Sequence, residues 1–243
     1  MAQCLCCQDW DRIGGFSKIV EKTMPIDHDY VVLLHGLGRT QRSMNTLGRR
    51  LAGNGLRVVN IGYRSRSGPI DQLSSFVWEE IERRCADRDR RIHFVTHSLG
   101  GIVLRHGYKT LGLNTLGRSV MLSPPNQGSE AIDLLRRYAI CRAILGPAGR
   151  QLGTSSDSLP NQLGPVDFEL GVIIGDRSVC SIPPLPSFLF GGANDGKVSV
   201  ARAGIPGMAD LLVLHCGHTF IMNSPAVASQ VSHFMTHGMF ERP

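Results

Sequence analysis

One serine in this sequence stands where its hydroxyl could become a nucleophile. Ser98 lies in the pentapeptide Thr96-His97-Ser98-Leu99-Gly100, which comes between a strand-like stretch and a helical stretch. A serine on such a sharp turn is exposed above the end of its strand, and small residues two positions away on either side let strand and helix approach closely. Because Thr96 is larger than the usual glycine, we expect some strain at this elbow. An ordinary packed turn is the alternative interpretation.

A serine hydroxyl is a weak nucleophile at neutral pH and needs a nearby base. Residues 211–214 predict a strand, and both His215 and His218 follow it. His215 lies against the strand end and could simply pack there, whereas His218 lies in the loop, where its imidazole can swing toward the serine. We therefore favour His218 as the general base. His35 and His97 flank the site and are expected to shape it without transferring protons. The remaining histidines are expected on the surface or in the core: His28, His93, His106, His233 and His237.

A carboxylate between Ser98 and His218 in the chain would orient the histidine. Asp195, in Asn194-Asp195-Gly196, satisfies the order serine, acid, histidine that is typical of nucleophile-elbow enzymes. A buried carboxylate there would fix the imidazole tautomer and stabilise the imidazolium. A plain Asp-Gly turn is the alternative. Three other carboxylates compete for this role, the first as the main rival and the others as weaker candidates: Asp176, Asp167 and Asp210.

An early glycine-rich turn offers the backbone amides that acyl transfer requires. His35-Gly36-Leu37-Gly38 follows the first clear apolar run, and its glycines allow the backbone to bend inward. Negative charge that builds on a carbonyl oxygen must be met by two N–H groups. We expect these from Leu37 and from Leu99, the residue after the serine. A Gly-rich turn without such a role is the alternative.

Alternating strands and helices must position these residues. Short apolar or β-branched runs predict strands at residues 30–34, 56–61, 91–96, 119–122, 172–174 and 211–214. Helical spacing predicts helices at residues 43–52, from 69 onward, after 98 to about 111, and at 225–235. This alternation favours an α/β fold with a mostly parallel central sheet and helices on both faces.

The alternation breaks between residues 126 and 170. Residues 129–145 predict one helix with Ile132, Leu135, Ala139 and Ile140 on one side, and a stretch rich in Gly, Ser and Pro follows. Loops of this length are usually functional. We therefore expect an inserted cap or lid over the sheet, within a single domain spanning residues 1–243.

Several of these stretches together resemble the signatures of bacterial lipases and esterases in the α/β-hydrolase superfamily: His35-Gly36-Leu37-Gly38, Thr96-His97-Ser98-Leu99-Gly100-Gly101, Pro125-Asn126-Gln127-Gly128-Ser129, Asn194-Asp195-Gly196 and Gly217-His218-Thr219-Phe220. The resemblance covers residues 30–235 and implies the α/β-hydrolase fold. It also implies hydrolysis of carboxylic esters through an acyl-enzyme without a cofactor, with a small-molecule ester or lipid as substrate.

The same three side chains would serve other substrates equally well. A phospholipid or other lipid acylhydrolase, a thioesterase, an amidase and an acyltransferase differ in the pocket rather than in the triad. A non-catalytic binding module on the same fold is the alternative from another class. Such modules typically lose a member of the triad, and the sequence offers all three.

Composition argues against several other classes. The formal net charge is +6, but the arginines are dispersed, with no long basic run and no basic stretch interleaved with aromatics. This pattern argues against a nucleic-acid site and leaves room for weak association with anionic membrane surfaces. No apolar run approaches the roughly 18–20 residues that cross a bilayer. No secretory signal is visible, so a cytoplasmic location is the default expectation.

The sequence has seven cysteines, an odd number, and no paired C-x-x-C spacings that support a zinc site. We expect free thiols in a reducing compartment. Cys4, Cys6 and Cys7 crowd the first residues, where they could take up metal or oxidise, but nothing nearby completes a ligand set.

Overall fold

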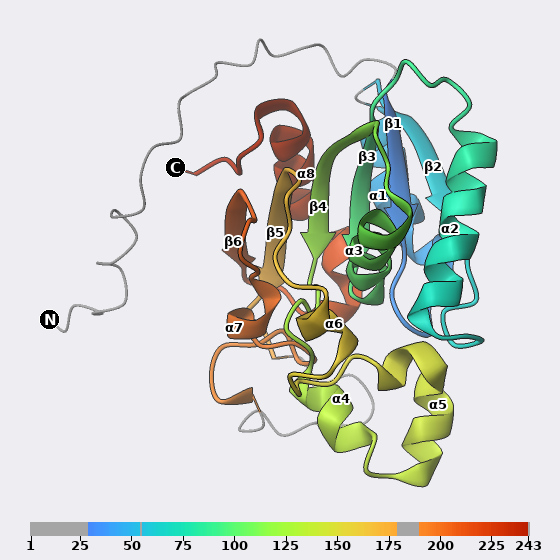
Figure 1. The fold of residues 1–243 in the computed structure, drawn as a ribbon. Coiled ribbons are helices and arrows are strands. Elements are labelled where there is room, and N and C mark those ends of the chain that lie inside the picture. The colour runs from blue at the N-terminus through green and yellow to red at the C-terminus, as the bar shows by residue number, and fades with distance from the viewer. Residues whose placement is uncertain (1–28, 54, 179–189, 243) are drawn as a thin grey trace, which may run out of the picture.

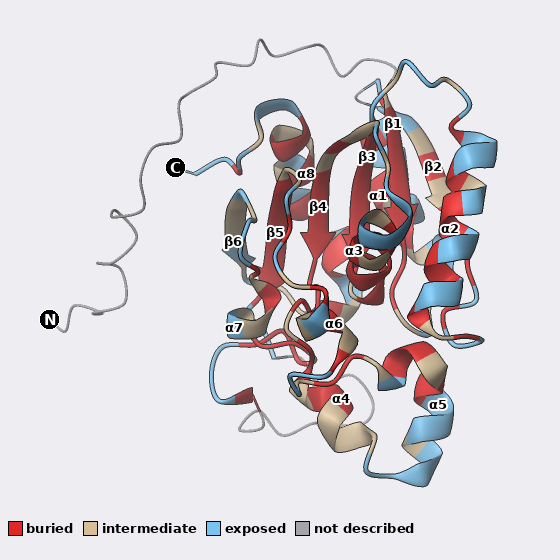
Figure 2. Ribbon diagram, viewed as in Figure 1, coloured by how far each residue is buried: buried red, intermediate tan, exposed pale blue. Residues whose placement is uncertain are grey.

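The computed structural model describes residues 29–53, 55–178 and 190–242 (Figure 1). Within them, six strands form one sheet in the order β2-β1-β3-β4-β5-β6, and every neighbouring pair is parallel. The strands are β1 (Tyr30–Leu34), β2 (Arg57–Ile61), β3 (Ile92–His97), β4 (Leu116–Leu122), β5 (Leu170–Gly175) and β6 (Asp210–Leu214). The central strands β1, β3 and β5 are buried throughout, as expected for a sheet that is covered on both faces (Figure 2).

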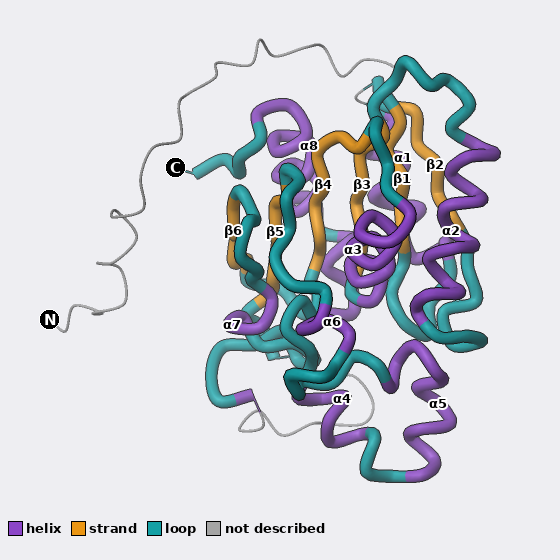
Figure 3. The backbone as a smooth tube through the Cα atoms, in the orientation of Figure 1, coloured by secondary structure: helices purple, strands orange, loops and turns teal. Residues whose placement is uncertain are grey.

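Helices cover both faces of the sheet (Figure 3). On one face α2 (Ile70–Arg84) and α3 (Leu99–Leu111) pack in the same core cluster as Val32 and Leu34. On the other face α1 (Asn45–Ala52) and α8 (Pro225–His237) pack with Val31 and Leu33. Alternate residues of a strand point to opposite faces, so one apolar strand serves two cores. The predicted α/β fold with a parallel sheet is confirmed.

The strand order creates a crevice at the carboxyl edge of the sheet. The chain leaves β1 toward β2 on one side, and β3 lies on the other side of β1. Ligands of open parallel sheets bind at such a reversal of strand order. Leu34 lies opposite Thr96 in the register of β1 and β3. The glycine-rich turn after β1 and the serine elbow after β3 therefore emerge side by side.

The cap, residues 126–170, differs from the predicted single helix at 129–145. It contains α4 (Glu130–Leu135), α5 (Ala139–Arg150) and α6 (Leu159–Gln162). The one-helix prediction is wrong, because α4 ends at Leu135 and α5 begins only at Ala139. Within α5 the chain kinks at Gly146, where φ is 65° and Pro147 follows. Ile140 was expected on the buried side and is 73% exposed.

Tertiary contacts, which helical spacing does not report, fix α4 and α5 in place. The carboxylate of Asp133 in α4 accepts the backbone amide of Thr154 at 3.1 Å. A Cβ on Gly146 would lie 2.4 Å from the carbonyl oxygen of Arg66, so the kink is pressed against the loop before α2. α4 and α5 lie beyond the carboxyl edge of the sheet (Figure 1).

Three shorter helices complete the described elements. They are the 3-10 helices η1 (Gln41–Met44) and η3 (His218–Asn223), and α7 (Val200–Ala203). In the described part of the chain, no helix combines the length and apolar character needed to span a bilayer.

The described cysteines are free thiols, at positions 85, 141 and 216. Burial raises the pKa of Cys85 and of Cys216 to about 11, so both stay protonated at neutral pH. The hypotheses on Cys4, Cys6 and Cys7 lie outside the described residues.

Candidate active site

Ser98 occupies a strained turn between β3 and α3. Its φ is 52° and its ψ is −119°, and its amide donates to the carbonyl oxygen of Leu122 at 2.9 Å, which continues the pairing of β3 with β4. A non-glycine residue in such a region costs on the order of 1–3 kcal/mol and persists only where its surroundings impose it. Here Gly100 permits the turn, because a Cβ there would lie 2.7 Å from the carbonyl oxygen of Leu34.

Thr96, where strain was expected, pairs within the sheet in regular register. The positive φ belongs to Ser98 instead. Thr96 is fully buried, and its hydroxyl has no hydrogen-bond partner among the residues that the structure describes. The cost of threonine at this position is thus a desolvated hydroxyl rather than a distorted backbone.

His218 and Asp195 form a buried pair on the loops that follow β6 and β5. His218 Nδ1 lies 2.8 Å from Asp195 Oδ2, and the two side chains are 5% and 0% exposed. Asp195 Oδ1 accepts the amides of Lys197 and Val198 at 3.0 and 2.9 Å. Both oxygens of the carboxylate therefore have donors, and the acid is fixed in place.

This arrangement sets the charge and the tautomer of the pair. Burial alone would raise the pKa of Asp195, but the electrostatic interaction and hydrogen bond with His218, together with the Val198 amide, outweigh burial and hold the pKa below its usual range. An ionised Asp195 accepts the proton on Nδ1 of His218, which leaves Nε2 unprotonated. His218 can then accept a proton through Nε2.

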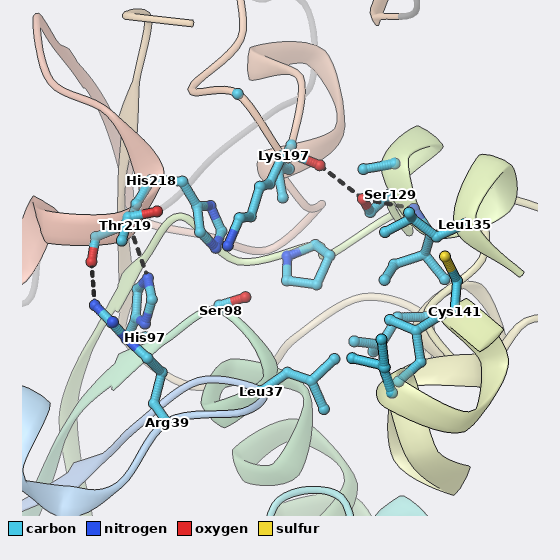
Figure 4. A pocket seen from close by; sticks show the side chains of 18 residues that line it. Leu37, Arg39, His97, Ser98, Ser129, Leu135, Cys141, Lys197, His218 and Thr219 are labelled. Carbon is cyan, nitrogen blue, oxygen red and sulfur yellow. Dashed lines mark hydrogen bonds between the residues drawn. The ribbon is translucent and has the colours of Figure 1, made fainter. Parts of the chain in front are cut away.

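The imidazole of His218 and the hydroxyl of Ser98 face one cavity (Figure 4). The cavity has a volume of about 230 Å³. Its apolar wall comes mainly from the cap and includes Ile132, Leu135, Ile144, Leu145 and Leu152. Pockets that bind the apolar part of a ligand have this character, with few polar groups at fixed positions.

A family model described as the alpha/beta hydrolase family matches residues 31–230. The chain belongs to this family. The predicted membership is confirmed, and the six parallel strands and the serine elbow are this hydrolase's version of the fold.

Solved structures with the same fold are distant in sequence. The mature lipase BlEst2 of Bacillus licheniformis has a TM-score of 0.65 at 19% identity, over 89% of this chain and 94% of that chain. The metagenomic carboxyl esterase MGS0156 has a TM-score of 0.63 at 19% identity, over 92% and 81% of the two chains. Phospholipase PlaB from Legionella pneumophila has a TM-score of 0.62 at 19% identity, over 86% of this chain and 58% of that chain. No curated protein sequence matches this chain. Identity this low shows the fold alone.

The two predicted oxyanion residues lie on either side of the crevice of this hydrolase, Leu37 on the turn after β1 and Leu99 at the start of α3. Leu37 lines the cavity beside Ser98. A Cβ on Gly36 would lie 2.8 Å from His97 Nδ1 and 3.2 Å from Ser98 Cβ, so the turn after β1 passes directly against the elbow. Leu99 is the first residue of α3, where backbone amides have no acceptor within the helix and the helix dipole is positive. Leu37 and Leu99 as an oxyanion hole remain a prediction.

The rival base and the rival acid pair with each other away from the cavity. His215 Nδ1 lies 2.9 Å from Asp176 Oδ1, and these side chains are 78% and 39% exposed. Asp210 pairs with Arg242, and Asp167 lies beside Phe168 and Glu169 in a different pocket. The structure therefore brings His218 and Asp195 to Ser98 and leaves these four candidates elsewhere.

The two flanking histidines support the site through the backbone. His97 Nε2 lies 3.1 Å from the carbonyl oxygen of His218, and burial lowers the pKa of His97 well below its usual value. The ring of His35 stacks on Tyr63 at 4.2 Å and accepts the Tyr63 amide through Nε2 at 3.3 Å. A neutral His97 can donate through Nε2 to the loop that carries His218. That both histidines shape the site without transferring protons stays a prediction.

Arg39 and Gly175 are site residues that sequence reasoning missed. The guanidinium of Arg39 donates to the carbonyl oxygen of Thr219 and so ties the turn after β1 to the histidine loop (Figure 4). A Cβ on Gly175 would lie 3.2 Å from Asp195 Cβ and 2.0 Å from the Cys216 carbonyl oxygen. Arg39 and Thr219 are 180 residues apart, so no local pattern could have reported the contact.

Proposed function

We propose that this α/β hydrolase is a serine hydrolase that cleaves carboxylic esters, with Ser98 as nucleophile, His218 as general base and Asp195 as the orienting acid. One observation carries the proposal. A serine held at φ 52° lines the same cavity as a histidine whose Nδ1 lies 2.8 Å from a buried carboxylate. Nucleophilic acyl transfer requires a nucleophile, a base beside it and a third group that orients the base.

The reaction follows from these positions. His218 Nε2 takes the proton of the Ser98 hydroxyl while the oxygen attacks the ester carbonyl carbon, and the amides of Leu37 and Leu99 stabilise the resulting oxyanion. The carbonyl re-forms, the alcohol leaves with the proton from His218, and an acyl-enzyme remains on Ser98. Water then attacks this ester with His218 again as base, which releases the carboxylic acid and the free serine.

The apolar lining of the cavity suits the acyl chain of an ester substrate. Its wall of leucine and isoleucine side chains suits an alkyl chain, and no Asp or Glu is among its lining residues. The lining does not distinguish an oxygen ester from a thioester or a lipid ester, because these differ in the leaving group. Lipid acylhydrolase, thioesterase and acyltransferase activities are therefore the second candidates on the same triad.

The deciding experiment compares Ser98→Ala with the wild-type protein on p-nitrophenyl esters of graded chain length and on acyl-CoA. Ser98→Ala should lower kcat at least about 10⁴-fold and abolish labelling by a fluorophosphonate probe, while the circular dichroism spectrum is unchanged. Ser75→Ala, an exposed serine on α2, is the matched control and should keep full activity. Full activity or labelling in Ser98→Ala would refute the proposal. Turnover of acyl-CoA alone would move the assignment to a thioesterase.

A further inference from the structure

The part of the cap that projects furthest from the sheet is largely exposed (Figure 2), and several of its exposed side chains are large and apolar. We call residues 136–144 the cap tip; they comprise the turn after α4 and the first part of α5. Tyr138, Ile140 and Ile144 of the cap tip are 57%, 73% and 57% exposed. Ile140 and Ile144 lie four residues apart on α5 and so share one face of the helix. Exposed large apolar side chains that share a face mark an interaction site more often than single ones do.

Positive charge accompanies these side chains. Arg136, Arg137 and Arg142 lie in the cap tip, and residues 136–150 include no Asp or Glu. Arg136 pairs with Asp133 at 3.0 Å. Arg137 and Arg142 are exposed to solvent, and the guanidinium of Arg142 also donates to the carbonyl oxygen of Arg136 at 3.3 Å. Interleaved apolar and cationic side chains are the pattern of segments that lie in the headgroup region of an anionic bilayer.

The cap tip is continuous with the cavity that holds Ser98. Cys141 and Ile144 line the cavity, and Ile144 is also exposed on the outside of α5. The same turn of α5 therefore contributes to both the outer surface and the inner wall. Figure 4 shows Cys141 on the α5 side of the cavity, across from His218 and Ser98. A molecule held against the cap tip would thus lie beside the apolar wall of the cavity.

We infer that the cap tip docks this protein onto an anionic lipid surface. Tyr138, Ile140 and Ile144 would enter the interface, and Arg137 and Arg142 would meet lipid phosphates. Tyrosine is favoured at the headgroup level of a bilayer, and guanidinium groups bind phosphate oxygens with two hydrogen bonds. This inference goes beyond the proposed hydrolase activity, since docking is measurable without turnover.

Cosedimentation with vesicles tests the inference. Vesicles of phosphatidylcholine mixed with phosphatidylglycerol are compared with vesicles of phosphatidylcholine alone, using the full chain. Each arginine near an anionic surface contributes about a 5-fold gain in partitioning. Arg137→Gln/Arg142→Gln should therefore weaken binding to the anionic vesicles about 25-fold, and Ile140→Ser should weaken binding to them as well.

Matched controls separate the cap tip from the general positive charge. Arg49→Gln/Arg88→Gln removes two exposed arginines outside the cap, and Leu111→Ser removes an apolar side chain that is 51% exposed at the end of α3. These controls should bind as the wild type does. All the variants should retain hydrolysis of a soluble short-chain ester, and Ser98→Ala should bind vesicles unchanged. If the wild-type protein binds anionic vesicles but hydrolyses no ester, only the proposed function is rejected.

Three results would each overturn the inference. The first is equal binding to neutral and anionic vesicles, and the second is binding that the cap-tip variants leave unchanged. The third is self-association in the absence of lipid that Ile140→Ser abolishes, because the cap tip would then be covered by a second copy of the chain.

Discussion

Asp195 holds His218 at two points. Its side-chain oxygen Oδ2 lies 2.8 Å from His218 Nδ1, and its backbone carbonyl oxygen accepts the amide of His218 at 2.9 Å. The first contact fixes the ring, and the second fixes the loop from which the ring projects. The position of the imidazole therefore depends on one residue of a different loop.

Replacing the acid tests this dependence. Asp195→Asn keeps the backbone contact but removes the charge that selects the Nδ1–H tautomer, so kcat should fall about 10⁴-fold. Asp176→Asn is the matched control, because it removes the exposed carboxylate that pairs with His215. It should keep wild-type kcat. Steady-state kinetics on a p-nitrophenyl ester provide the measurement, and equal losses in both variants would contradict the assignment of the acid.

The elbow depends on a glycine that no side chain can replace. A Cβ at Gly100 would lie 2.7 and 3.0 Å from the carbonyl oxygens of Leu34 and His35. Gly100→Ala should lower the free energy of unfolding by about 1–3 kcal/mol, as overpacking does, and should nearly abolish turnover. Gly192→Ala has open space around its Cβ and should change the free energy of unfolding by less than about 0.5 kcal/mol. Urea denaturation compares the two, and a fully stable, active Gly100→Ala would show that the elbow can widen.

The buried histidine beside the nucleophile should make stability depend on pH. Burial in the folded chain lowers the pKa of His97 well below its usual value, so the folded chain keeps this imidazole neutral. In the unfolded chain the same imidazole takes up a proton near pH 6.5. Below that pH the unfolded state binds more protons, and the free energy of unfolding should decrease as pH falls from about 7 to 5.

His97→Gln separates this residue from the other histidines. The glutamine amide can still donate to the His218 carbonyl oxygen but does not titrate. The dependence of the urea midpoint on pH should therefore become shallower, while kcat at pH 8 stays within about an order of magnitude of the wild type. An unchanged slope between pH 7 and 5 would show that His97 does not contribute to the acid sensitivity.

The apolar wall of the cavity should limit the length of the acyl chain. Leu135 of α4 lines the cavity, and a larger side chain there would reduce its volume from about 230 Å³. Leu135→Trp should reduce kcat/KM for p-nitrophenyl octanoate by at least about tenfold relative to p-nitrophenyl butyrate, since one methylene in a pocket changes the rate roughly 10–200-fold. Leu134→Trp, one position away and outside the lining, is the control. A uniform loss on both esters would indicate damage to the fold instead.

The sequence was sufficient for the features that depend on local pattern. The apolar runs located each of the six strands to within a few residues. The signal is clearest for β1, β3 and β5, because a strand buried on both faces must be apolar throughout. The choice of Asp195 and His218 rested on their order in the chain after Ser98, because nucleophile-elbow enzymes have the acid and then the histidine after the serine. Family membership, predicted from the same stretches, is confirmed over residues 31–230.

The cap shows where local pattern was insufficient. Helical spacing predicted one helix over residues 129–145, but α4 ends at Leu135 and α5 begins only at Ala139. Asp133 of α4 accepts the amide of Thr154, and Gly146 of α5 lies close to the backbone of Arg66. These contacts join residues that are far apart in sequence, so no window along the chain could report them.

Tertiary structure decided which histidine lines the cavity and which carboxylate pairs with it. His215 and His218 follow the same strand, and both Asp176 and Asp195 follow β5. Packing left one pair 78% and 39% exposed and the other 5% and 0% exposed. A sequence lists the groups that could react, but the buried contact between His218 and Asp195 forms only when the loops after β5 and β6 meet beside the elbow after β3.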